Sequence, residues 1–298
     1  MIMNDRMIPQ IPPTGEIMRI LIDSDVATEI DDLYALTIAF GHPERFLIEG
    51  IVAAHFSGNG PSNSKKLSFE LLKELLQKSG MEGKFPIAEG SHPMQYANTP
   101  NDSEGVDLII RKAMESTPED PLWVIGIGAA TDLACALLKA PDIVSRVRYV
   151  FHARSEHTWP DRNEQFNVYG DIIAAQTLLE SEVPLIWFDT GTHICASYEE
   201  TEEKLAPMGD YGKFLHEFRD RNAWFCQSDK GFFDMGDFSF LYQPDWGRYE
   251  TVETPEMTRF MHFKHTHRHG KMMRVYDIDV KKTWDLFYEA VNNLRKGV

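Results

Sequence analysis

The chain has 298 residues, a hydrophobic share of 43% and a formal net charge of −16 at pH 7. This length and apolar content predict a globular protein with one large α/β domain or two small ones. A surface this acidic repels the phosphates of nucleic acids, so we expect no DNA or RNA partner.

The cysteines and the apolar runs indicate where the protein works. There are three cysteines, Cys135, Cys195 and Cys226, and no CxxC pair. Such an odd, sparse set argues against a disulfide framework and fits a reducing compartment. The first nine residues lack the apolar core of a secretory signal, and no apolar run is long enough to span a bilayer. We therefore expect a cytoplasmic protein that does not engage a membrane.

Apolar strand-like runs alternate with helical patterns along the chain, which is typical of parallel βαβ units. The predicted strands are 18–22, 46–54, 85–88, 122–127, 148–151 and 184–189. The predicted helices are 33–40, 64–78, 106–116, 133–139, 171–180, 200–222 with a break near Pro207, and 280–295. The sequence therefore predicts an α/β fold with a Rossmann-like, open and mostly parallel sheet flanked by helices. We expect a single domain over residues 1–298, with a flexible N-terminal extension over residues 1–16.

The most informative segment is acidic and lies between the first predicted strand and the first predicted helix. It holds five carboxylates in ten residues, namely Asp23, Asp25, Glu29, Asp31 and Asp32. Helix capping accounts for one or two of these acids, but not for five. Ligands of open α/β sheets bind at the carboxyl ends of the strands. Repulsion among the acids is relieved by a hard divalent cation with oxygen ligands, and Ca²⁺ is the natural candidate.

The acidic segment resembles the amino-terminal metal motif of the inosine- and uridine-preferring nucleoside hydrolases, in the branch whose motif runs DxDxxxExDD. Later segments resemble further motifs of this family in the same order, so the resemblance spans nearly the whole chain. These segments are 127–134, 159–167, 233–246 and 277–287. The resemblance implies the family's fold, Ca²⁺-dependent cleavage of the N-glycosidic bond of a ribonucleoside or related glycoside, and a homodimer or homotetramer.

The resemblance also implies a set of metal ligands. The set is Asp25, Asp32, the backbone carbonyl of Thr131, and Asp234. Asp237 competes with Asp234 for the last place, and we prefer Asp234 because it has the family's spacing to Pro244. Carboxylate and carbonyl oxygens suit Ca²⁺, and no thiolate or histidine accompanies them to suggest zinc.

The expected chemistry gives each acid of the segment a role. Asp25 is expected to be the general base toward a water whose pKa the bound ion lowers. Asp31 is expected to accept a hydrogen bond from a sugar hydroxyl. Asp23 is expected to orient the loop, and Glu29 fits either of these last two roles. The carboxylates together stabilise the oxocarbenium-like charge on the sugar.

Asn59, Gln165 and Asn167 are expected to contact the substrate. Three positions depart from the family pattern or replace one of its residues. Gln165, ahead of Asn167, stands where the family has a glutamate that contacts the sugar. Phe233 stands where some members have a histidine that protonates the leaving base, and Asn59 replaces an asparagine that follows the second strand. These departures leave two alternatives open. One is a hydrolase of the same fold that cleaves a different glycoside, and the other is a metal-dependent binding protein without turnover.

Two further features have competing interpretations. Trp159 lies in a loop expected to overhang the site, where it either stacks on a leaving base or packs against the protein. The segment 262–269 contains four histidines, and alternate spacing would place three of them on one face of a strand. A zinc site there is conceivable, but no cysteine or acid lies among them. We therefore predict a solvated edge strand or loop.

Overall fold

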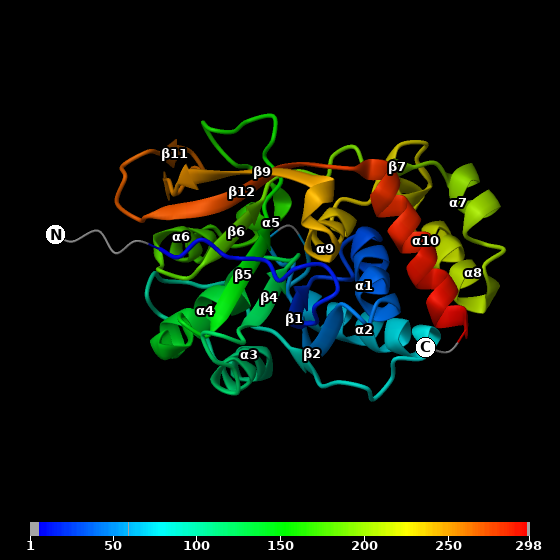
Figure 1. Ribbon diagram of the computed structural model, residues 1–298, viewed down its shortest axis with the longest axis horizontal. Helices are drawn as coiled ribbons and strands as arrows, with labels where there is room; N and C mark the ends of the chain where they lie inside the picture. Colours follow the sequence, from blue (N-terminus) through cyan, green and yellow to red (C-terminus); the bar gives the residue numbers. More distant parts are fainter. Residues whose placement is uncertain (1–5, 59, 297–298) are drawn as a thin grey trace.

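The computed structural model describes residues 6–58 and 60–296. An eight-stranded sheet runs through it, in the order β3-β2-β1-β4-β5-β6-β12-β9, with helices on both faces (Figure 1). Neighbouring strands are parallel except for the last pair, in which β12 and β9 are antiparallel. The structure thus confirms the predicted Rossmann-like, mostly parallel α/β fold.

The main sheet is built from strands far apart in the chain. In chain order they are β1 (Met18–Ser24), β2 (Phe46–Ala53), β3 (Ile87–Glu89), β4 (Leu122–Gly126), β5 (Val147–His152), β6 (Leu185–Phe188), β9 (Gly247–Glu253) and β12 (Lys271–Ile278). Two short antiparallel pairs lie outside it. They are β7 (Cys195–Ala196) with β8 (Lys230–Gly231), and β10 (Glu256–Met257) with β11 (Phe263–Lys264).

The helices connect the strands and cover the sheet. The α-helices are α1 (Asp31–Gly41), α2 (Ser64–Ser79), α3 (Glu104–Met114), α4 (Thr131–Lys139), α5 (Phe166–Gly170), α6 (Ile172–Glu180), α7 (Tyr198–Lys204), α8 (Gly209–Glu217), α9 (Met235–Tyr242) and α10 (Val280–Lys296). The 3₁₀ turns are η1 (Pro141–Ile143), η2 (Phe218–Arg221), η3 (Ala223–Cys226) and η4 (Pro244–Trp246). The predicted helix over 200–222 is thus two helices and a 3₁₀ turn, with the break where Pro207 indicates it. Among the described helices, none is long and apolar enough to cross a bilayer.

Side chains on successive strand residues point to opposite faces of the sheet, and this alternation builds two hydrophobic cores. Ile20 and Ile22 of β1 pack in the core that contains α1, α2, α9 and α10, whereas Leu21 packs in the core that contains α3, α4 and α6. Every residue of α1 is buried, between the sheet and the neighbouring helices α9 and α10. The acidic segment therefore lies between a central strand and a fully enclosed helix.

The sequence gives no prediction of β9 or β12 as strands, although β12 lies inside the sheet. Arg274 interrupts the apolar pattern of β12, and it is buried because its Nε lies 2.5 Å from Asp189 Oδ2. β9 is an exposed edge strand without an apolar alternation. Of the histidine-rich segment 262–269, only 263–264 belongs to a strand, and the side chains are mostly exposed. The exposed side chains of His262, His265 and His267 agree with the predicted solvated loop.

The described part of the predicted flexible extension, residues 6–16, lies against the folded protein. The Arg6 side chain is 5% exposed and donates hydrogen bonds to the backbone carbonyl of Leu179 and to Thr254. Arg45, at the start of β2, donates to backbone carbonyls of the same segment. These contacts fix the segment without helix or strand, so residues 6–16 depart from the sequence expectation.

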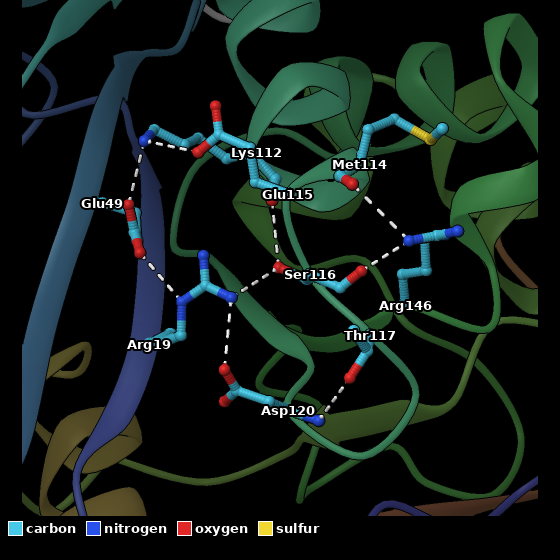
Figure 2. A network of polar contacts seen from close by, with 9 residues as sticks. All are labelled: Arg19, Glu49, Lys112, Met114, Glu115, Ser116, Thr117, Asp120 and Arg146. Atoms are coloured by element: carbon cyan, nitrogen blue, oxygen red, sulfur yellow. Dashed lines mark hydrogen bonds and ion pairs between the residues drawn. The ribbon is translucent and has the colours of Figure 1, made fainter.

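Charged side chains are paired near the amino ends of the strands (Figure 2). Glu49 of β2 lies between Arg19 of β1, at 2.9 Å, and Lys112 of α3, at 3.0 Å. Arg19 also lies 3.4 Å from Asp120, which precedes β4. Burial alone would raise the pKa of Glu49, but the hydrogen bonds from Lys112 and Arg19 outweigh burial and hold that pKa below its usual range.

This network predicts a pH-dependent contribution to stability. Replacing Glu49→Gln should lower the free energy of unfolding by about 1 kcal/mol at pH 7, because both cations lose their shared anion. Since the folded-state pKa of Glu49 is lowered, its contribution is present above the unfolded pKa and disappears as the pH falls through the folded pKa. Urea denaturation of both proteins at pH 7 and pH 4 measures the difference.

The control is Glu115→Gln, which removes a half-exposed carboxylate bound to Lys112 alone. Its effect should be smaller than that of Glu49→Gln at pH 7. Equal losses in the two variants would contradict the shared-anion interpretation.

Candidate functional site

A cavity of about 410 Å³, open to solvent, lies at the carboxyl ends of β1, β4 and β5. We call it the acidic cavity. It is lined by Asp25, Thr28, Glu29, Asp31, Asp32, Ile127, His152, Arg154, Gln165, Phe166, Asn167, Phe233 and Asp234. The structure therefore brings together most of the residues that the sequence analysis selects, at the predicted edge of the sheet.

Short hydrogen bonds hold the acidic segment in place. β1 ends at Ser24, whose hydroxyl donates to Asp32 Oδ1 at 2.5 Å across the loop. Thr28 Oγ1 donates to Asp25 Oδ2 at 2.7 Å. Both bonds are local, so the loop positions Asp25 and Asp32 before any ligand arrives.

A further acid reaches the cavity from the start of α9, far along the chain from the acidic segment. Asp234 lies at the N-terminus of this helix, and its carboxylate oxygen lies within 4.8 Å of those of Asp31 and Asp32, all three being buried. His152 Nδ1 lies 2.6 Å from Asp237 Oδ2 and 3.5 Å from Asp234 Oδ1. Asp234 lines the acidic cavity whereas Asp237 is turned toward His152, so the geometry favours Asp234 over Asp237 as a ligand.

Burial, and to a smaller extent the repulsion among neighbouring carboxylates, raises the pKa values of the cavity acids. Burial, with a smaller contribution from the charges of Asp31 and Glu29, raises the pKa of Asp25 to about 7 against the hydrogen bond from Thr28. Burial and neighbouring carboxylates also raise the pKa values of Asp32 and Asp234 well above their usual range. Among the described residues, no lysine or arginine forms an ion pair with these three acids.

An oxygen-only set of uncompensated buried carboxylates fits a hard divalent cation. Lys230, which is not among the lining residues, lies 2.7 Å from Glu29 Oε2, and Arg154 in the cavity wall forms no ion pair with a described carboxylate. Glu29 lines the acidic cavity, but Lys230 holds its Oε2, so we do not assign Glu29 to the metal ligands. The residues present therefore suit a metal ion, and a bound ion would remove the mutual repulsion that raises these pKa values.

The structure does not bring the predicted carbonyl ligand, Thr131, to the acidic cavity. Thr131 begins α4, so its carbonyl belongs to the hydrogen-bond ladder of that helix. Its hydroxyl donates to Asp171 Oδ2 at 2.8 Å and lies 2.6 Å from His55 Nε2. Ile127, directly after β4, lines the cavity instead, and its carbonyl accepts a hydrogen bond from Asn167 Nδ2 at 3.0 Å.

Two other predicted site residues, Trp159 and Asp23, do not line the acidic cavity. The Trp159 ring packs under the guanidinium of Arg274, at 4.7 Å, and against Phe263, at 5.2 Å, which supports the packing interpretation. Asp23 is fully buried below the cavity. Asn59 lies outside the residues that the structure describes, so its expected role stays a prediction.

Sequence reasoning missed two polar residues of the cavity, His152 and Arg154. They lie at and just beyond the end of β5. The rule that selects the acids after β1 also applies here, because the carboxyl ends of parallel strands share one edge. The signal was the polar sequence His152-Ala153-Arg154 directly after a buried apolar run.

A model of the inosine-uridine preferring nucleoside hydrolase family matches residues 20–285 of the chain. The chain belongs to this family. The match covers the acidic segment and both helices that contribute acids, so it confirms the resemblance on which the site prediction depends. The family comprises hydrolases of N-glycosidic bonds, and its match accounts for the position of the acidic cavity in the sheet.

Individual relatives are distant. Over 197 residues, 57% of this chain, the sequence is 26% identical to an uncharacterised protein of Schizosaccharomyces pombe, and the matched part spans 60% of that protein's length. A purine-preferring ribonucleoside hydrolase from Gardnerella vaginalis superposes with a TM-score of 0.70 at 18% identity, covering 94% of this chain and 100% of the other. An inosine-uridine preferring nucleoside hydrolase from Bacillus anthracis gives 0.72 at 14% identity, covering 93% and 100%. These structures share the fold.

Below the cavity, Asp23 faces a second buried acid, Asp132 of α4. Neither oxygen of Asp23, nor Asp132 Oδ2, has a donor among the described residues, whereas Asp132 Oδ1 accepts from the Ser91 backbone N–H at 2.8 Å. Burial raises the pKa of Asp23 well above its usual range, and the charge of Asp132 and a hydrogen bond to it add to the shift. Burial likewise raises the pKa of Asp132 to about 6. We therefore predict that the two carboxyl groups share one proton.

Replacing Asp132→Asn should therefore stabilise the protein by about 1 kcal/mol at pH 8, because an amide N–H then donates to Asp23 without a bound proton. In the wild type, the folded state holds more protons than the unfolded state, so this pair costs stability as the pH rises through about 6. Urea denaturation at pH 5 and pH 8 measures the gain, which should be larger at pH 8. Asp132→Ala, which leaves Asp23 without a donor, should be less stable than either protein. A variant Asp132→Asn that is no more stable than wild type at pH 8 would contradict the shared proton.

The acids of the cavity predict that stability depends on pH and metal together. Without metal, the raised pKa of Asp25 means that the folded state binds more protons than the unfolded state, so stability falls as the pH rises from about 4 to about 7. A divalent cation replaces these protons. Calcium or magnesium chloride should therefore raise the melting temperature more at pH 7.5 than at pH 5, as calorimetry can measure.

Asp32→Asn should lose most of this metal-induced shift, whereas the exposed control Asp285→Asn should keep it. Equal shifts at the two pH values, or an undiminished shift in Asp32→Asn, would argue against a metal at these acids.

Proposed function

We propose that this protein is a Ca²⁺-dependent hydrolase that cleaves the N-glycosidic bond of a ribonucleoside or a related N-glycoside. One observation carries the proposal. The buried carboxylate oxygens of Asp31, Asp32 and Asp234 come from opposite ends of the chain and lie within 4.8 Å of one another. They share a cavity with Asp25 in a chain of the nucleoside hydrolase family.

Asp25, Asp32 and Asp234 would hold the ion, and the Ile127 carbonyl is the backbone oxygen available at the cavity in place of that of Thr131. Several oxygen ligands on a loop and a helix end suit Ca²⁺ better than Mg²⁺, which demands a tighter octahedron. His152 is engaged by Asp237, and no thiolate lines the described cavity, so zinc is not favoured. When bound, the ion supplies a Lewis acid that lowers the pKa of a water.

Asp25 is suited to accept the proton of the attacking water. Its Oδ2 is occupied by the Thr28 hydroxyl, which leaves Oδ1 for the water. Beside a bound cation, the Asp25 carboxylate would be unprotonated at neutral pH and therefore able to accept a proton from the attacking water. Asp31 lines the same wall and is proposed to accept a hydrogen bond from a sugar hydroxyl. The charges of the cavity favour the positive charge that develops on the sugar ring.

The opposite wall is proposed to position the sugar. Asn167 Nδ2 donates to the carbonyls of Ile127, at 3.0 Å, and His152, at 3.3 Å, so Asn167 fixes both residues at the wall. Gln165 Oε1 accepts the backbone N–H of Asn167 at 2.8 Å. The Nε2 group of Gln165 has no other partner among the described residues and is left to contact substrate.

A hydrolase of the same fold that cleaves a different glycoside is the second candidate. Gln165 and Phe233, the two departures from the family pattern, both line the acidic cavity. A phenylalanine offers no proton to a leaving base, and a glutamine reads a sugar differently from a glutamate. These residues therefore favour a substrate that differs from the common nucleosides in its leaving group or sugar.

The assembly and location of the protein stay predictions from the sequence. The family resemblance implies a homodimer or homotetramer, and the cysteine content fits the cytoplasm. Light scattering on the eluted protein measures the assembly directly.

The central test is replacement of Asp25→Asn. The rate of base release should fall by about 10²- to 10⁴-fold, because the general base is lost while its shape is kept. The measurement is chromatographic detection of free base from a panel of ribonucleosides in calcium chloride, with and without a chelator. Asp285→Asn, an exposed acid bound to Lys281, is the matched control and should keep full activity.

Other results of this assay would favour one of the two alternative functions. Wild-type protein that releases no base from any nucleoside but cleaves another glycoside would select the second candidate. Tight nucleoside binding without hydrolysis over long incubation would select the metal-dependent binding protein.

A further inference from the structure

Arg154 lies where the acidic cavity meets a second hollow of about 500 Å³. The two hollows share Arg154 and Gln165 in their walls, so the space beyond the acids continues outward past these two side chains. Arg154 follows the end of β5, a central strand, which holds its backbone at the carboxyl edge of the sheet. A substrate oriented by the acids at one end would therefore reach Arg154 at the other.

The guanidinium of Arg154 is held in position but left without an anion. Its central carbon lies 3.8 Å from the centroid of the Phe233 ring, and Nη1 is 3.4 Å from Thr192 Oγ1. Nε is buried and has no hydrogen-bond partner among the described residues. No described carboxylate forms an ion pair with Arg154, although the cavity that it lines is rich in acids. A buried donor without an acceptor is costly, so the geometry calls for an acceptor from outside the chain.

The chemistry of the guanidinium narrows what that acceptor is. Stacking on Phe233 orients the plane of the guanidinium, and Nη2 has no hydrogen-bond partner among the described residues. A planar, charged donor of this kind matches the oxygens of a phosphate or carboxylate. A guanidinium keeps its charge at neutral pH, so Arg154 is a poor proton donor to a leaving base. The neighbouring side chain Gln165 adds a neutral amide donor and no negative charge that would repel an anion.

We infer that Arg154 and Gln165 bind an anionic group on the glycosyl unit of the substrate, so that the preferred substrate is a ribosyl compound carrying one phosphate. This inference rests on the proposed function, because the acids and their metal must first orient the sugar. Glu156 and Glu164 line the hollow beyond Arg154, and their charges oppose a longer polyphosphate chain. Arg154 is then a specificity-determining residue.

The test uses the full chain in calcium chloride and two probes, ribose and ribose 5-phosphate. Calorimetric titration should give ribose 5-phosphate a dissociation constant about tenfold to hundredfold lower than that of ribose, as expected for a charge-assisted hydrogen bond. Arg154→Gln should reduce this ratio to about twofold or less, and Arg154→Lys, which keeps the charge but not the planar fork, should restore part of it. Added salt should shrink the wild-type ratio.

The matched control is Arg259→Gln. Arg259 also stacks on a phenylalanine, Phe260, at 4.8 Å, but it is exposed and lies outside the acidic cavity. This variant should keep the wild-type ratio. Equal binding of the two probes by wild type, or an unchanged ratio in both Arg154 variants, would overturn the inference while ribose binding keeps the proposed function intact. If neither sugar binds the calcium-loaded protein, the proposed function fails, and the inference fails with it.

Discussion

The properties of the acidic cavity follow from carboxylates that are buried close together without enough positive charge to compensate them. Asp25, Asp32 and Asp234 are almost fully enclosed, and burial raises the pKa of each. Without a cation, buried carboxylates so close together would take up protons or move apart. The fold prevents separation, because β1 and the enclosed helix α1 fix two of the acids and α9 fixes the third. The uncompensated charge is thus held ready for a cation.

Charged side chains are paired at one edge of the sheet and left largely unpaired at the other. Near the amino ends of the strands, Glu49 lies between Arg19 and Lys112, and the charges are matched (Figure 2). At the carboxyl ends, Asp25, Asp32 and Asp234 form no ion pair with a described lysine or arginine. The same parallel topology produces both edges, so the contrast comes from the residues placed there. Stability is built at one edge, and the capacity to bind a ligand is built at the other.

Within the acidic cavity, charge changes sign over a short distance. Asp31 and Asp234 lie on one side, and Arg154 lies near the opening, stacked on Phe233. A metal ion would compensate the first side, and an anion on the substrate would compensate the second. The replacement of a family glutamate by Gln165 removes a negative charge that would oppose this arrangement. The effect of the residue at position 165 can thus be judged only once its neighbour Arg154 in the cavity wall is known.

The sequence by itself determined the βαβ alternation, the acidic segment after the first strand and the family, because periodicity and short motifs are local. Its spacing to Pro244 also selected Asp234, which lines the acidic cavity. Only the tertiary structure decided which partners meet across the fold. Ile127 replaces Thr131 at the cavity because α4 engages the Thr131 carbonyl, and Trp159 packs under a distant arginine. The strand β12 escaped prediction because its charged residue is buried by an ion pair formed between segments far apart in the chain. Long-range contacts of this kind leave no local pattern.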